Sequence, residues 1–135
     1  MIAKIAVAAA SFAIDKPYSY QIPQGMDLKP GMRVTVPFGR GNRKSEGVVL
    51  TVEEAPPENL KFVAQGLDDA PVLSDTMLHL AAFMRERYFC TFFEAIRVML
   101  PAGLWFQTKD NYTLTDDRSW KQRFAKRMPL QCFII

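Results

Sequence analysis

The sequence predicts a mainly-β (α+β) fold in which a small antiparallel barrel precedes a short pair of helices. Short strand-like segments, separated by turns rich in Gly and Pro, fill the first half of the chain, as is typical of small barrels. After residue 74 the apolar residues recur at helical spacing. Of the 135 residues 49% are hydrophobic, so the chain has enough apolar surface for a buried core.

Five strands are expected before the helices begin. The predicted strands are residues 2–9, 17–23, 32–38, 45–54 and 60–67. The first is apolar nearly throughout, which favours burial on both faces. In the second, Tyr18, Tyr20 and Ile22 alternate with polar residues and therefore share one face.

Alternation also assigns faces in the third and fourth strands. Val34 and Val36 are expected to point into the core, and Arg33 to point away from it. The expected core face of the fourth strand is formed by Val48, Leu50 and Val52. The hairpin tip between these strands reads GRGNRK.

Two helices are predicted from capping signals and periodicity. Ser74 can accept hydrogen bonds from the free amides of the first turn, and the helix after it carries an apolar face. That face is expected to comprise Met77, Leu80, Ala81, Met84 and Tyr88. Thr91 and Glu94 form a capping box for a second short helix, which ends before Pro101.

Charge and cysteine content narrow the classes of function. The net charge is +3 and the isoelectric point about 9.0, a weak indication of a polyanionic partner. Of the two cysteines, Cys90 lies in an aromatic run and is expected to be a buried thiol, and both fit a reducing cytoplasm. Closely spaced Cys and His ligands are lacking, and so is an apolar run of about 18 residues, so neither a metal site nor a membrane span is predicted.

Catalytic motifs are not found. Lys44-Ser45 after glycines is similar to a phosphate-binding P-loop, but Arg43 stands where glycine is needed and a strand follows instead of a helix. His79, the only histidine, lacks a partner one helical turn on, and a structural or solvated role is expected. For Asp68-Asp69 a loop or cap role is expected. The chain itself is therefore not expected to be an enzyme.

A binding signature remains at the hairpin. Five cations fall within sixteen residues, which would gather positive charge at one end of a barrel: Lys29, Arg33, Arg40, Arg43 and Lys44. A positive groove with exposed aromatic rings is how barrel folds hold single-stranded nucleic acid. Tyr18 and Tyr20 are the candidate stacking residues. Core packing is favoured for Tyr20, whereas both core packing and stacking stay open for Tyr18. The alternative for the hairpin is a solvated turn without a binding role.

Several sequence blocks resemble a known family. The stretch PYSYQIPQGMDLKPGMRVTVPFGRGNRKSEGVV, followed by NLKFVAQGLDDAPVL and RYFCTFFEAIRVMLPAG, resembles the N-terminal region of the primosomal replication-restart helicases, the PriA (primosomal protein N′) family. The resemblance covers about residues 3–104. The Val-Pro-Phe-Gly run is moderately specific by itself and strong in this order with the other blocks.

The resemblance implies a 3′ DNA-binding domain: an OB-like barrel with a helical extension, which holds the 3′ end of a nascent leading strand at a stalled fork. Carried over by motif, the pocket residues are Tyr18, Ser19, Tyr20, Gly39 and Lys61. Fold analogy adds phosphate contacts from Arg40, Arg43 and Lys44. The family usually has Asp where Ser19 stands, so one hydroxyl replaces a charged acceptor of two hydrogen bonds.

The resemblance also divides the chain. Residues 1–103 are expected to form the DNA-binding domain, and 104–135, with a strand-like NYTLT and a basic helical stretch, the truncated start of a winged-helix-like domain or a non-native tail. Helicase motifs are not found here, so ATP and zinc are implied only for other parts of a parent protein. DNA is the expected partner, with single-strand-binding protein and other primosome proteins as further candidates. A sequence-tolerant single-strand-binding barrel and a protein-interaction module remain the alternatives.

Overall fold

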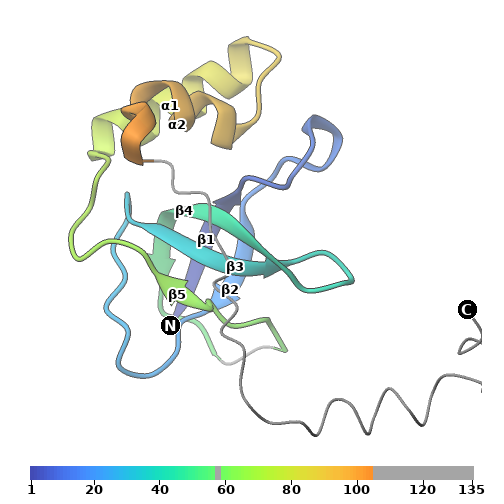
Figure 1. Ribbon diagram of the computed structural model, residues 1–135, viewed down its shortest axis with the longest axis vertical. Helices are drawn as coiled ribbons and strands as arrows, with labels where there is room; N and C mark the ends of the chain where they lie inside the picture. Colours follow the sequence, from blue (N-terminus) through green and yellow to red (C-terminus); the bar gives the residue numbers. More distant parts are fainter. Residues whose placement is uncertain (57–58, 105–135) are drawn as a thin grey trace, which may run out of the picture. The chain divides into compact units, whose positions relative to one another are not determined.

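The computed structural model describes residues 1–56 and 59–104 of the chain. Strands come first and two α-helices follow, within the compact unit Met1–Leu104 (Figure 1). In chain order the elements are β1 (Ile2–Val7), η1 (Phe12–Ile14, a 3₁₀ turn), β2 (Tyr18–Gln21), β3 (Arg33–Phe38), β4 (Arg43–Glu53), β5 (Gln65–Gly66), α1 (Asp75–Arg87), α2 (Phe92–Met99) and η2 (Ala102–Leu104, a second 3₁₀ turn). The predicted mainly-β fold with a helical pair after it is confirmed.

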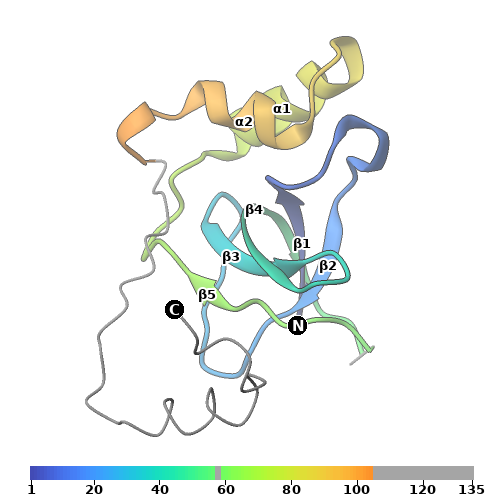
Figure 2. The same ribbon diagram turned by 45° about the vertical axis from the view of Figure 1, so that its right-hand side comes forward.

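The strands form one antiparallel sheet in the order β2-β1-β4-β3-β5. This sheet is not closed, so the expected barrel is an open sheet, as Figure 2 shows. An isolated parallel bridge between Gln21 and Phe62 connects the edge strand β2 to the segment that leads into β5. The two edges of the sheet therefore approach each other without a continuous ladder between them.

The predicted fifth strand, residues 60–67, is much shorter in the structure. Its backbone hydrogen bonds are divided between two partners: Val63 donates to the carbonyl of Gln21 at 3.0 Å, and Ala64 donates to that of Thr35 at 2.9 Å. A segment that passes from β2 to β3 within two residues cannot build a long ladder with either. Only Gln65–Gly66 remains as strand β5.

A β-bulge corrects the predicted core face of β4. The pairing register of β1 with β4 shifts so that Ile5 lies opposite Val49, and Leu50 is an extra residue without a partner on β1. Such a bulge reverses the alternation of side chains beyond it. Val48 and Val49 are both fully buried, and Val52 packs against the core as predicted, whereas Leu50 is only partly buried. The predicted face was therefore wrong at Leu50, and it left out Val49.

Arg33 was also placed wrongly, because it lies inside the protein and not on the outer face. The residue is 4% exposed. Its backbone N–H donates to the carboxylate of Asp68 at 2.9 Å, its Nε donates to the same group at 3.0 Å, and its guanidinium also donates to the carbonyl of Leu104. Alternation could not reveal this, because the partner stands 35 residues away in the chain.

The electrostatics of this pair favour the charged forms. Burial raises the pKa of Asp68, but the hydrogen bonds and positive charge of Arg33 outweigh burial, so the pKa lies below its ordinary value. The hydrogen bond from Arg33 to Asp68 in turn raises the arginine pKa. Asp68 was expected to serve as a loop or cap residue, and the structure shows it as half of a buried ion pair.

The helix boundaries follow the predicted caps. The Ser74 hydroxyl accepts from the amide of Met77 at 3.4 Å, and Thr91 and Glu94 make both hydrogen bonds of a capping box. The two helices lie side by side in both views (Figures 1 and 2). The predicted apolar face of α1 is only partly buried: Ala81 is fully buried, whereas Leu80 and Tyr88 are exposed.

Some predictions fall outside the described residues. The strand and basic helix expected within 105–135, the domain assignment of that segment and Cys132 all lie there. Cys90 is a free thiol and is half-buried instead of fully buried. Among residues 1–56 and 59–104, no three His, Cys, Asp or Glu side chains are grouped as a metal site would require. Within the same ranges, neither α-helix is long and apolar enough to cross a bilayer.

Candidate nucleic-acid interface

An open cavity of about 340 Å³ lies between β2, the end of β3 and the segment before β5. Its walls are formed by Tyr18, Ser19, Tyr20, Phe38, Gly39, Asn59, Leu60 and Lys61. All five residues that the family resemblance assigned to DNA-end binding are among them. The structure thus brings together three segments that are far apart in sequence.

Gly39 and Lys61 face each other across one side of this cavity. The Lys61 ammonium donates a hydrogen bond of 2.7 Å to the carbonyl oxygen of Gly39. Gly39 has φ +72°, a left-handed conformation that glycine adopts without strain, and a Cβ built there would meet nothing within 4 Å. The backbone at this point is therefore exposed to a ligand. An ammonium has three N–H donors, and among the described residues the Gly39 carbonyl accepts from one of them.

Tyr18 stands at the rim with its ring fixed from two sides. Its hydroxyl donates to the carbonyl of Ile14 at 2.6 Å. The ring packs edge-to-face on Phe38, with centroids 5.0 Å apart and an interplanar angle of 86°. The Lys16 ammonium lies 5.7 Å from the Tyr18 ring centroid. Tyr18 is half-buried, so part of its surface remains accessible.

Tyr20 and Ser19 have opposite environments. Tyr20 is buried, as the alternation predicted, and its hydroxyl donates to the carbonyl of Pro37 at 3.1 Å. Burial raises the pKa of Tyr20, and the neighbouring Tyr18 raises it further, so the phenol stays protonated and serves as a donor. Ser19 is exposed on the same strand and is one of the residues that line the cavity.

The hairpin between β3 and β4 carries the exposed cations. Arg40, Arg43 and Lys44 are all exposed. A second cavity, of about 390 Å³, is lined by Ala9, Phe38, Gly39, Gly41, Arg43, Lys44 and Ser45. The two cavities share Phe38 and Gly39, so they adjoin at the same glycine. Arg40 lines neither cavity.

The predicted cluster of five cations is smaller in the structure. Arg33 is committed to Asp68 in the interior, and the Lys29 ammonium lies 3.4 Å from the carboxylate of Asp27. The exposed cations beside the two cavities thus include Arg40, Arg43 and Lys44 of the hairpin, Lys61, and Lys16 next to the Tyr18 ring. His79 is exposed, and its Nδ1 lies 2.8 Å from the carbonyl of Asp75, in keeping with the structural or solvated role expected for it.

Three cavity residues had not been assigned a role from the sequence: Phe38, Asn59 and Leu60. A signal for each was present. Phe38 belongs to the Val-Pro-Phe-Gly run, and Asn59 and Leu60 directly precede Lys61 within a block that supports the family resemblance. These residues meet at the cavity because the segment before β5 returns to β2, and the alternation of side chains does not predict that long-range contact.

Aromatic side chains, exposed main chain and a cationic rim on an open antiparallel sheet define a nucleic-acid-binding β-domain. Comparison with known families makes this more specific. The family model of the PriA 3′DNA-binding domain (3′BD) matches residues 4–101, and the chain belongs to this family.

Two relatives show the scale of the match. The chain is 37% identical over 108 residues to the replication restart protein PriA of Bacillus subtilis (strain 168), which covers 76% of this chain and 13% of the relative. It is 32% identical over 107 residues to the replication restart protein PriA of Haemophilus influenzae (strain ATCC 51907 / DSM 11121 / KW20 / Rd). This match covers 74% of this chain and 14% of the relative. The matched region thus spans a small part of each relative.

Proposed function

We propose that this chain is the DNA-binding part of a replication-restart protein and captures the 3′ end of a nascent leading strand at a stalled fork. One observation carries the proposal: Tyr18, Ser19, Gly39 and Lys61 line a single open cavity, in which the lysine lies against the glycine backbone. The cavity volume, about 340 Å³, is within the range of small-ligand pockets. The family name refers to binding of 3′ DNA.

Each residue has a role that suits a terminal nucleotide. The accessible surface of the Tyr18 ring offers a stacking surface, and stacking on aromatic rings is worth about 1–3 kcal/mol per base. The Ser19 hydroxyl and the main chain at Gly39 supply hydrogen bonds to the sugar or the base edge. The Lys61 ammonium neutralises the adjacent phosphate.

The hairpin extends the site beyond the terminal nucleotide. Since the second cavity begins at Gly39, a strand with its end in the first cavity can pass over this residue toward Arg43 and Lys44. Their charges neutralise the next phosphates. Arg40, exposed at the same tip, adds a third cation.

The test uses the 135-residue chain and matched fluorescent oligonucleotides that end in a 3′-hydroxyl or a 3′-phosphate. Capture of a free end predicts tighter binding to the hydroxyl form, because a 3′-phosphate takes the place of the hydroxyl that Ser19 and the Gly39 main chain are proposed to bind. Equal binding would favour sequence-tolerant single-strand binding instead. Absence of binding to both would favour a protein-interaction module.

The parent protein that we propose is several times longer than this chain. The relatives are named replication restart proteins, and the chain covers 13% and 14% of their length. We place ATP-dependent 3′–5′ unwinding, with ATP and zinc as its cofactors, in the remaining length. Single-strand-binding protein and other primosome proteins are proposed partners of that whole protein, and the cytoplasm is its proposed location.

A further inference from the structure

Asp15 anchors the loop between β1 and β2. The loop residues 8–17 are exposed except for Ala10 and Asp15. The side chain of Asp15 is only 3% exposed and lies at the end of the short turn η1. A buried carboxylate requires partners, because desolvation of an unpaired charge is costly.

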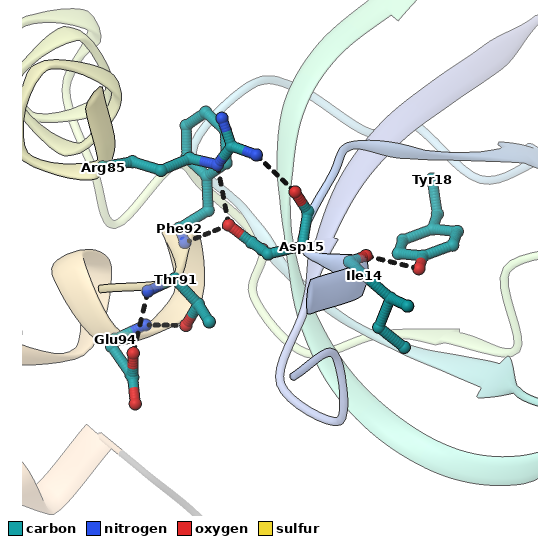
Figure 3. Close-up of polar contacts among 7 residues, drawn as sticks. All are labelled: Ile14, Asp15, Tyr18, Arg85, Thr91, Phe92 and Glu94. Carbon is teal, nitrogen blue, oxygen red and sulfur yellow. Dashed lines mark hydrogen bonds and ion pairs between the residues drawn. The ribbon is translucent and has the colours of Figure 1, made fainter. Parts of the chain in front are cut away.

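Both helices supply these partners, as Figure 3 shows. Arg85, near the end of α1, donates from Nε to the Asp15 carboxylate at 2.7 Å, and its guanidinium also donates to the Asp15 carbonyl. The backbone N–H of Phe92, the first residue of α2, donates to the same carboxylate oxygen at 3.0 Å. The negative charge also suits the positive end of the α2 dipole.

The residue before Asp15 makes a hydrogen bond to a residue of the cavity wall. The Ile14 carbonyl accepts the Tyr18 hydroxyl at 2.6 Å (Figure 3). The turn is therefore attached to the helices through Asp15 and to the cavity wall through Ile14. One short backbone segment carries both attachments.

We propose that the Asp15–Arg85 pair is a positioning element of the 3′-end pocket, which fixes Tyr18 through the Ile14 carbonyl. The proposal rests on the proposed function and assigns the helical pair a part in DNA binding. Asp15 and Arg85 do not line the cavity, so in this proposal they act on it only through the turn. They set the fraction of molecules in which Tyr18 is placed for stacking.

The expected effect follows from that fraction. Apparent affinity is the intrinsic affinity multiplied by the population of the competent state. If loss of the pair leaves the turn correctly placed about one tenth of the time, affinity for a 3′-hydroxyl end falls about tenfold. Binding through the hairpin cations, measured with a 3′-phosphate oligonucleotide, should not change.

The variants are Arg85→Ala and the milder Asp15→Asn, which retains an acceptor for the Phe92 amide. Arg87→Ala is the control, since that residue lies on the same helix and contacts the exposed Phe83 ring instead of the loop. Binding is measured at a temperature where circular dichroism shows each variant folded. Loss of the preference for a 3′-hydroxyl in both variants, but not in the control, supports the proposal. Unchanged preference in both, or an equal loss in the control, overturns it.

A double-mutant cycle tests the route through Ile14. Tyr18→Phe removes the hydroxyl that bonds to Ile14. Arg85→Ala should therefore reduce the affinity for a 3′-hydroxyl end less in that background than in the wild type. Additive losses of affinity would contradict the route through Ile14. Amide chemical shifts of Ser19 and Gly39 in the DNA-free protein provide a second readout. Both shifts should change in Arg85→Ala, and unchanged shifts would overturn the proposal. This readout needs no DNA. Absence of an end preference in the wild type would instead refute the proposed function.

Discussion

The ammonium of Lys61 donates a hydrogen bond of 2.7 Å to the carbonyl oxygen of Gly39, which joins the segment before β5 to the end of β3. The two residues stand 22 positions apart in the chain. This contact places the positive charge of Lys61 beside the backbone of a glycine at the wall of the open cavity. The following predictions test that cavity and the fold around it.

Lys61→Ala should weaken binding of a 3′-hydroxyl oligonucleotide about tenfold, or roughly 1.4 kcal/mol, because a charge-assisted contact to phosphate is lost. Lys4→Ala is the matched control, since the Lys4 ammonium is held by Glu53 at 2.8 Å on the exposed surface. Fluorescence anisotropy measures both. A larger loss for Lys4 than for Lys61 would contradict the assigned pocket.

Gly39→Ala should lower the free energy of unfolding by about 1 kcal/mol, because a left-handed backbone is strained for an L-residue. It should also weaken DNA binding, since the new methyl group occupies the ligand side of the cavity. Gly41→Ala is the control for stability: it has no positive φ, and a Cβ there meets nothing within 4 Å. Urea denaturation compares the two, and equal destabilisation would exclude a special role for the Gly39 conformation.

The salt dependence of binding should report the hairpin cations. Neutralisation of three or four single-strand phosphates predicts a log–log slope of about −2 to −3. Arg43→Ala and Lys44→Ala should each reduce its magnitude by about 0.7, whereas Lys29→Ala should not, because the Lys29 ammonium pairs with Asp27 and lines neither cavity. A slope near zero for the wild type would show that the hairpin makes no DNA contacts.

Ser19→Asp should strengthen the preference for a 3′-hydroxyl about tenfold, because a carboxylate accepts stronger, charge-assisted hydrogen bonds than a hydroxyl does. Ser19→Asn is the control, because asparagine has the same shape as aspartate but no charge. Competition between 3′-hydroxyl and 3′-phosphate oligonucleotides measures the ratio. If both variants behave as the wild type does, Ser19 is not at the terminal nucleotide.

Asp68→Asn should destabilise the fold by about 3 kcal/mol at pH 7, because the buried Arg33 guanidinium loses the negative charge of its carboxylate partner. The folded-state pKa of Asp68 lies below the ordinary value of 3.8, so its stabilisation is complete above the unfolded pKa. That contribution disappears as the pH falls through the lower folded-state pKa. The difference from wild type should therefore shrink below about pH 4.

Thermal unfolding across the pH range measures this difference. Asp69→Asn is the control, since the neighbouring aspartate is exposed, and a change within about 0.5 kcal/mol is expected. A pH-independent difference between wild type and Asp68→Asn would contradict the lowered pKa.

Features that depend on near neighbours in the chain were predictable from the sequence. The Ser74 cap and the Thr91–Glu94 capping box are made of residues three positions apart, and both appear in the structure. The burial of Tyr20, Val34 and Val36 followed from alternation. Ser19, Gly39 and Lys61 were assigned to the pocket by the family resemblance alone, whereas Tyr18 and Tyr20 were also candidates from the residue pattern.

The sequence by itself determined the class of fold, the caps and the residue types at the hairpin, since these depend on propensity, period and charge over a few positions. Tertiary structure alone decided that Leu50 is a bulge, that Arg33 is buried against Asp68, and that Lys61 faces Gly39. The physical reason is that each of these depends on strand register or on a partner more than twenty residues away. Register and long-range partners are chosen by the packing of the whole sheet.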